Sequence, residues 1–166
     1  MRRAALLALT AVAGLVLSGC SHPGTPEKPQ VVVTTNILGD ITKEVLGDQA
    51  EVTTLMQPNA DPHSFEISAQ LAALMGSADL VVSNGLGLEE GLQQHLDRAA
   101  KAGAPVMAAG EVIDVVPYSS GDAEGAPDPH FWTDPAAMID VVDAVEGAAR
   151  DIDGIDPTKL ASSAGA

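Results

Sequence analysis

Short runs of β-branched and apolar residues alternate along this chain with stretches of helical periodicity. Four such runs, residues 31–35, 50–56, 80–83 and 105–108, have the length and composition of strands. The first, VVVTT, is typical of a strand buried on both faces, and the third is LVVS. Strands that alternate with helices predict an α/β fold: a parallel sheet of about four strands, joined by right-handed crossovers and flanked by helices.

Between and after these strands, apolar residues recur at intervals of three or four and predict amphipathic helices. Ser68 suits the N-cap of one short helix, and Asp134 followed by Pro135 is a strong start signal for another. The apolar stripe of this last helix is expected at Met138, Ile139, Val142 and Val145. The four predicted helices cover residues 37–47, 68–75, 88–103 and 134–154, and residues 112–118 favour an additional edge segment of the sheet.

The first nineteen residues have the organisation of a secretory signal peptide, which predicts that residues 1–19 are removed. Arg2 and Arg3 precede an apolar run at residues 4–17 that is too short to span a membrane. The run ends in Leu-Ser-Gly-Cys, which resembles the lipobox of bacterial lipoproteins, so Cys20 is the expected lipidation site. Residues 20–30, rich in proline, are then expected to form a lipidated flexible tether.

Acidic side chains dominate the charge of the chain: 23 Asp and Glu against 8 Lys and Arg give a formal charge of −15. Such a surface repels phosphate backbones, which argues against a nucleic-acid partner. With 46% apolar and 19% charged residues, the chain has the composition of a folded domain with a core. Cys20 is the single cysteine, so no internal disulfide can form.

The sequence Asp-Pro-His occurs twice, at residues 61–63 and 128–130. Only 2% of the chain is aromatic, yet three of its four aromatic residues lie within two positions of His63 or His130. Neutral imidazole is the most common metal-ligating side chain, and a preceding proline stiffens the turn that carries it. Both histidines lie in loops that lead into predicted helices. Because loops at the carboxyl ends of parallel strands share one crevice, we expect a single metal site.

Two histidines do not complete a zinc site, which needs four ligands, or three and a water molecule. Asp61, Asp128 and Asp134 are candidates for the remaining positions, although turn formation or helix capping is the simpler explanation for each of them. His95 lies on a helical apolar stripe, where a structural role at the edge of the core is the simpler interpretation. The acidic residues at 151–156 lack EF-hand spacing, and no HExxH, GxSxG, P-loop or dinucleotide fingerprint is present.

Several segments resemble, in their order, the zinc/manganese solute-binding lipoproteins of ABC importers (cluster A-I). They are the lipobox, both Asp-Pro-His motifs with their flanking residues, and residues 84–89, NGLGLE. The likeness extends from Cys20 to about residue 160. It implies two α/β lobes joined by a long helix, with one metal ion in the cleft and with His63 and His130 among its ligands. Residues 31–166 would then form the N-terminal metal-binding lobe.

The resemblance implies a function: extracytoplasmic capture of Zn²⁺ or Mn²⁺ by a protein anchored to the cell membrane through Cys20, which delivers the metal to an ABC permease. It implies no enzymatic activity. Family members are about twice as long and take their other ligands from a second lobe, so we expect this chain to hold half of a metal site. Whether it is a fragment, a split gene product or a natural truncation stays open.

Two further questions stay open at this level. The loop before His130 carries no histidine run of the kind that zinc-type relatives often have, so the choice between zinc and manganese is not made. The alternative function is that of a surface adhesion or structural lipoprotein without metal delivery. A zinc hydrolase is a third class, but it would need a third ligand, an open water position and a general base, for which no motif is present.

Overall fold

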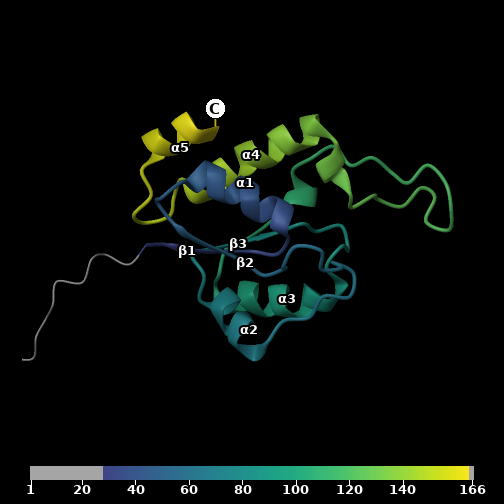
Figure 1. Ribbon diagram of the computed structural model, residues 1–166, viewed down its shortest axis with the longest axis horizontal. Coiled ribbons are helices and arrows are strands. Elements are labelled where there is room, and N and C mark those ends of the chain that lie inside the picture. Colours follow the sequence, from purple (N-terminus) through teal and green to yellow (C-terminus); the bar gives the residue numbers. More distant parts are fainter. Residues whose placement is uncertain (1–27, 165–166) are drawn as a thin grey trace, which may run out of the picture.

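Four short parallel strands lie at the centre of the structure, with helices on both faces of the sheet (Figure 1). The computed structural model describes residues 28–164. The strands are β1 (Gln30–Val33), β2 (Glu51–Thr54), β3 (Leu80–Ser83) and β4 (Val106–Ala108), in the order β2-β1-β3-β4. All three pairings are parallel. The predicted α/β fold with a four-stranded parallel sheet is therefore confirmed.

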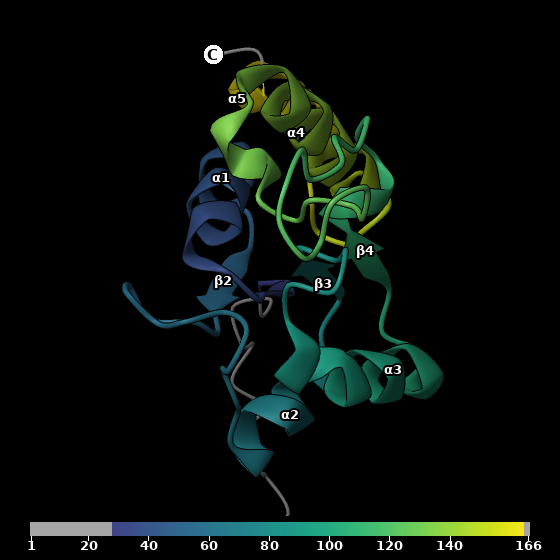
Figure 2. The ribbon, with the colours of Figure 1, turned by 90° about the vertical axis from the view of Figure 1, so that its right-hand side faces the viewer.

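Within the described residues, five α-helices form the two outer layers (Figure 2). One layer consists of α1 (Asn36–Leu46), α4 (Pro135–Ala149) and α5 (Pro157–Ala164), and the other of α2 (Ala69–Gly76) and α3 (Gln93–Ala102). None of them is long and apolar enough to cross a membrane. Single 3-10 turns occur at η1 (Glu90–Leu92), η2 (Ala109–Glu111) and η3 (Phe131–Thr133).

The alternation of side chains along β1 and β3 gives the sheet two separate cores. Val31 and Val82 pack in the cluster beneath α1, α4 and α5, whereas Val32 and Val81 pack in the cluster that faces α2 and α3. All four side chains are completely buried. Because burial of such a side chain contributes about 1.5–3 kcal/mol, these two strands take the central positions.

Local signals set the helix ends largely as predicted. The Ser68 hydroxyl accepts a hydrogen bond from the Leu71 N–H at the start of α2, and Asp134 caps α4 by accepting from the Ala136 N–H. Gly103 ends α3 with a φ of 101°, a left-handed conformation that glycine adopts without a steric cost. The predicted N-caps at Ser68 and Asp134 are confirmed.

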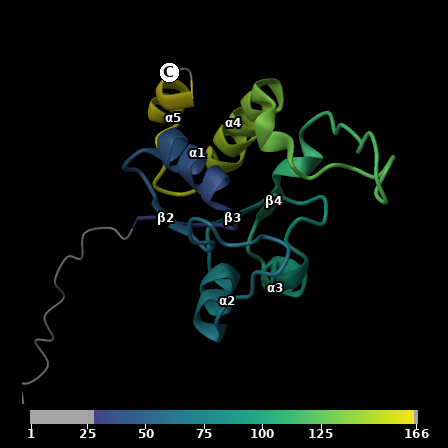
Figure 3. The same cartoon turned by 45° about the vertical axis from the view of Figure 1, so that its right-hand side comes forward.

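Four expectations about these elements are wrong in whole or in part. Residues 112–118 form no strand; they contribute only an isolated bridge between Pro117 and Pro127, within a segment that extends away from the body (Figure 3). The helix after Asp134 ends at Ala149 and not at Gly154, and α5 follows it. The buried stripe of α4 consists of Ala137, Val141, Val145 and Ala149. Of the four predicted positions Val145 is confirmed, Met138 and Val142 are half-buried against the same core, and only Ile139, which is 63% exposed, is wrong. Ala137 and Ala149 lie on this buried face although alanine is small, so a search for large apolar side chains does not identify the face.

The third predicted helix also begins later than expected. Leu88 is completely buried but lies in a turn, and α3 starts only at Gln93, after η1. The predicted signal peptide at residues 1–19, the lipidation of Cys20 and most of the tether at residues 20–30 lie outside the described residues.

Candidate metal centre

The two Asp-Pro-His turns meet at the end of the sheet where the strands terminate. His63 lies in the loop between β2 and α2, and His130 directly precedes η3 and α4. Their ring centroids are 5.8 Å apart, with an angle of 55° between the ring planes. A zinc–imidazole bond is about 2.0–2.1 Å long, so two rings at this separation are close enough to share one ion.

The same local bond explains why aspartate begins both motifs. Asp61 Oδ1 accepts a hydrogen bond from the backbone N–H of His63 at 3.0 Å, and Asp128 Oδ1 accepts from that of His130 at 2.9 Å. An aspartate side chain that binds the backbone two residues on forms an Asx turn. The repeated sequence therefore produces the same turn twice and presents each imidazole from it.

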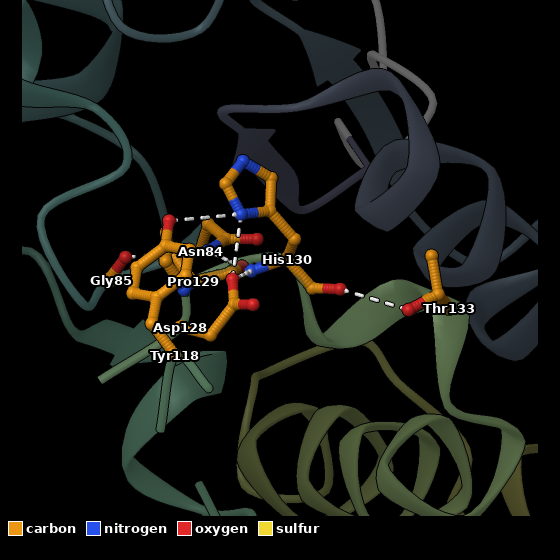
Figure 4. Close-up of polar contacts among 7 residues, drawn as sticks. All are labelled: Asn84, Gly85, Tyr118, Asp128, Pro129, His130 and Thr133. Carbon is orange, nitrogen blue, oxygen red and sulfur yellow. Dashed lines mark hydrogen bonds and ion pairs between the residues drawn. The ribbon is translucent and has the colours of Figure 1, made fainter. Parts of the chain in front are cut away.

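The imidazole of His130 is held by two side chains (Figure 4). Its Nδ1 lies 2.6 Å from Asp128 Oδ1 and 3.3 Å from the hydroxyl of Tyr118. The other ring nitrogen, Nε2, points away from both (Figure 4). A carboxylate that accepts the Nδ1–H fixes the tautomer with an unprotonated Nε2, which is the form that binds a metal.

The charges around His130 support this tautomer. The pKa of Asp128 lies below its ordinary value because the backbone N–H of His130, and then its ring, donate to the carboxylate. Burial and the adjacent charge of Asp128 raise the pKa of Tyr118. At neutral pH Asp128 is thus an acceptor and Tyr118 keeps its proton, so the anion beside the ring is Asp128.

His63 is positioned less firmly than His130. Within residues 28–164 its ring has no hydrogen-bond partner, and its side chain is exposed. Its turn is closed by Asp61 Oδ2, which accepts from the Ser64 hydroxyl at 3.1 Å. His63 can therefore reorient towards an ion that His130 already holds.

Two surface hollows flank the histidine pair. One, lined by Pro62 and Trp132 among other residues, lies on the apolar side, and the Trp132 ring is 5.2 Å from that of His130. The other contains His130 together with Asp114, Asp128 and Asp134. The three carboxylates favour the approach of a cation.

The remaining candidates do not complete a coordination shell. Asp134 is engaged as the cap of α4, and the carboxylate of Asp61 as the acceptor of its own turn. Over residues 28–164, no three His, Cys, Asp or Glu side chains are grouped so that they could hold a metal ion. His95 is half-buried on α3, next to Arg98, in agreement with a structural role. The acidic residues at 151–156 form an exposed turn before α5.

Sequence reasoning missed two parts of this site. Tyr118 is the fourth aromatic residue, but it lies 12 positions before His130 in a segment without periodicity. Only the folding back of that segment at the Pro117–Pro127 bridge brings it to the ring. Asn84 and Glu89 belong to the segment at residues 84–89, but spacing along the sequence does not predict their buried hydrogen bonds.

Comparison with known proteins relates this chain to metal-binding relatives. Residues 31–164 match the family model described as zinc-uptake complex component A periplasmic. The chain is 31% identical over 119 residues to the manganese ABC transporter substrate-binding lipoprotein PsaA of Streptococcus pneumoniae. This alignment covers 69% of this chain and 38% of that protein. It is 27% identical over 152 residues to the iron-binding protein YfeA of Yersinia pestis, in an alignment that covers 89% of this chain and 48% of that protein.

The fold is shared with solved structures as well. Superposition on the periplasmic zinc binding protein TroA from Treponema pallidum gives a TM-score of 0.73 at 28% identity, covering 83% of this chain and 49% of that one. The chain therefore spans less than half the length of each of these relatives.

Proposed function

This chain belongs to the family of periplasmic zinc-uptake complex component A proteins, and we propose that it binds a divalent transition-metal ion as the cargo of an ABC importer. The observation that carries the proposal is the pairing of His63 and His130, whose rings lie 5.8 Å apart at the end of the sheet. Neutral imidazoles are suitable ligands for zinc and for other first-row metals. The metal is bound as substrate and released, so no catalytic position is required.

Each histidine has a distinct part in the proposed capture. His130 is oriented in advance by Asp128 and Tyr118, so little entropy is lost when its Nε2 binds the ion. His63 closes onto the ion from the other loop. In a full-length relative of this family, a second lobe would supply further ligands and close over the ion, and preference for that closed form would drive the conformational change.

For the metal we propose Zn²⁺ or Mn²⁺. The names of the compared relatives mention manganese, iron and zinc, so they do not identify one ion for this chain. Two imidazoles follow the general affinity order, in which Zn²⁺ binds more tightly than Mn²⁺. We therefore expect this lobe alone to prefer Zn²⁺, whichever ion the complete transport system carries.

The place of capture follows from the N-terminal sequence. We propose that the chain is exported, lipidated at Cys20 and anchored to the outer side of the cell membrane, where it passes metal to the permease. Two or more acyl chains would make that anchoring durable. Mass spectrometry of the mature protein tests this step: a diacylglyceryl mass on the N-terminal cysteine supports it, and a free Cys20 thiol contradicts it.

Competitive chelator titration of the purified chain with Zn²⁺ and Mn²⁺ tests the proposed function. The wild type is compared with a His63→Ala/His130→Ala variant and with a His95→Ala control, since His95 lies on α3, away from the pair. We expect one ion per chain in the wild type and the control, and none in the double variant. Equal binding by all three proteins would contradict a metal site at these histidines.

A further inference from the structure

The NGLGLE segment, residues 84–89, folds around a buried carboxylate. Glu89 is only 3% exposed and accepts hydrogen bonds from the backbone N–H groups of Asn84 at 2.7 Å and Gly85 at 3.0 Å. The buried hydroxyl of Thr34, at the end of β1, donates to the same carboxylate. A buried charge is costly unless it is hydrogen-bonded, so these three donors make its position specific.

The carboxylate stabilises a turn that is unfavourable by itself. Gly85, Leu86 and Gly87 have φ values of 76°, 55° and 77°, and the left-handed region is disfavoured for a residue such as leucine. The turn lies where the strand order reverses, between the ends of β1 and β3. In open α/β sheets this is the location of the ligand crevice.

From this turn, Asn84 reaches the loop that carries His130 (Figure 4). Its Nδ2 donates to the carbonyl of Pro129 at 3.0 Å and to that of Gly85 at 3.2 Å, and the whole residue is buried. Among the described residues, this is the hydrogen bond that ties the second Asp-Pro-His turn to the end of the sheet. Apart from the hydroxyl of Thr133, which donates to the His130 carbonyl, the other partners of that turn are residues 116–118, which are themselves part of the extended segment.

Gly91, two residues after this segment, contacts the loop of the other histidine. A Cβ atom on Gly91 would lie 2.5 Å from the carbonyl oxygen of Phe65, two residues after His63. Real Cβ atoms do not approach this closely, so the absence of a side chain at Gly91 sets how near the first loop can lie. Residues 84–91 thus contact both histidine loops, one by a hydrogen bond and the other by close packing.

We propose that residues 84–91 set the distance between His63 and His130, with Asn84 and Gly91 as positioning residues that act through the two loops. The proposal rests on the metal-binding function above and identifies what holds the two histidine ligands at the distance at which they can share one ion. Glu89 acts indirectly, because it fixes the turn from which Asn84 reaches Pro129.

Two substitutions test the two contacts separately. Asn84→Asp keeps the size of the side chain but places a carboxylate oxygen against the Pro129 and Gly85 carbonyls, which repel it. Gly91→Ala displaces the Phe65 carbonyl and with it the first loop. We expect each change to weaken Zn²⁺ binding of the folded chain by about tenfold, within the range seen for residues that orient metal ligands.

Each variant has a matched control. Gln70→Glu adds the same charge on the exposed surface of α2, and Gly76→Ala adds a methyl group at the end of that helix, where no atom lies within 4 Å. Both controls should bind Zn²⁺ as the wild type does. Circular dichroism confirms the folded fraction of each protein, so that the affinity is compared between folded chains.

The deciding readout is ¹⁵N NMR of the imidazoles during Zn²⁺ titration. In the wild type, the ring ¹⁵N signals of His63 and His130 should shift over the same range of Zn²⁺ concentration. In Asn84→Asp the signals of His130 should no longer shift together with those of His63. In Gly91→Ala the signals of His63 should no longer shift together with those of His130. Wild-type affinity and joint changes in Gly91→Ala would overturn the proposal even if Asn84→Asp failed to fold. If the wild type bound no Zn²⁺, the proposed function itself would fail, and the positioning role with it.

Discussion

At the scale of single residues, the two Asp-Pro-His turns share a sequence and a backbone bond but differ in what the aspartate does for the ring. Asp61 Oδ1 contacts the backbone N–H of His63, whereas Asp128 Oδ1 contacts both the backbone N–H and Nδ1 of His130. Substitution of each aspartate in turn therefore distinguishes the effect of the backbone turn from the effect of orienting the imidazole.

Asp128→Asn should weaken Zn²⁺ binding by about tenfold, because the amide no longer provides the charged acceptor that fixes the His130 tautomer. Asp61→Asn changes the equivalent turn without a ring contact and should have a clearly smaller effect. Chelator competition on both variants measures the difference. Equal losses would show that the carboxylates act only on the backbone turns.

The lowered pKa of Asp128 has a consequence for stability in acid. A carboxyl group whose pKa is lower in the folded state stabilises the fold above its unfolded pKa, and this contribution is lost as the pH falls through the folded value. The wild type should therefore exceed Asp128→Asn in stability at neutral pH, and the difference should shrink below about pH 4. Urea unfolding of both proteins across this range measures it; a difference that stayed constant down to pH 2 would contradict the assignment.

At the scale of elements, close packing of α1 on β2 depends on Gly39. A Cβ atom there would collide with the side chain of Thr54, so Gly39→Ala should destabilise the fold by about 1–3 kcal/mol through overpacking. Gly147, in α4, has no atom within 4 Å of a new methyl group, and Gly147→Ala should be neutral or stabilise by up to about 1 kcal/mol. Denaturant unfolding compares the two, and a loss at Gly147 as large as at Gly39 would contradict this packing.

The elements differ in how far the sequence predicts them. VVVTT and LVVS identify strands because they are short runs rich in β-branched residues, and Asp134-Pro135 identifies a helix start by local bonding alone. The stripe of α4 is misplaced in part because two of its buried residues, at 137 and 149, are alanines, which a search for large apolar side chains passes over. The short helix α5 buries a single residue, Leu160, and so leaves no periodic signal.

At the scale of the whole molecule, the metal centre could be predicted only as far as its repeated parts. The two histidines were found because their motifs are alike and because loops at one edge of a parallel sheet converge. Tyr118, Asn84 and Glu89 act through contacts over 12, 45 and 55 positions of sequence, and such contacts depend on the complete fold. The sequence thus identifies candidate ligands, while the structure shows what orients them.

The central claim is that His63 and His130 bind one ion together. The most direct test measures Zn²⁺ affinity and stoichiometry for His63→Ala, His130→Ala and the double variant beside the wild type. A shared site predicts that each single variant loses nearly as much affinity as the double variant, because one imidazole alone holds the ion weakly. If the single losses instead added up independently, or if each single variant kept a full-affinity ion, the two histidines would not form one site.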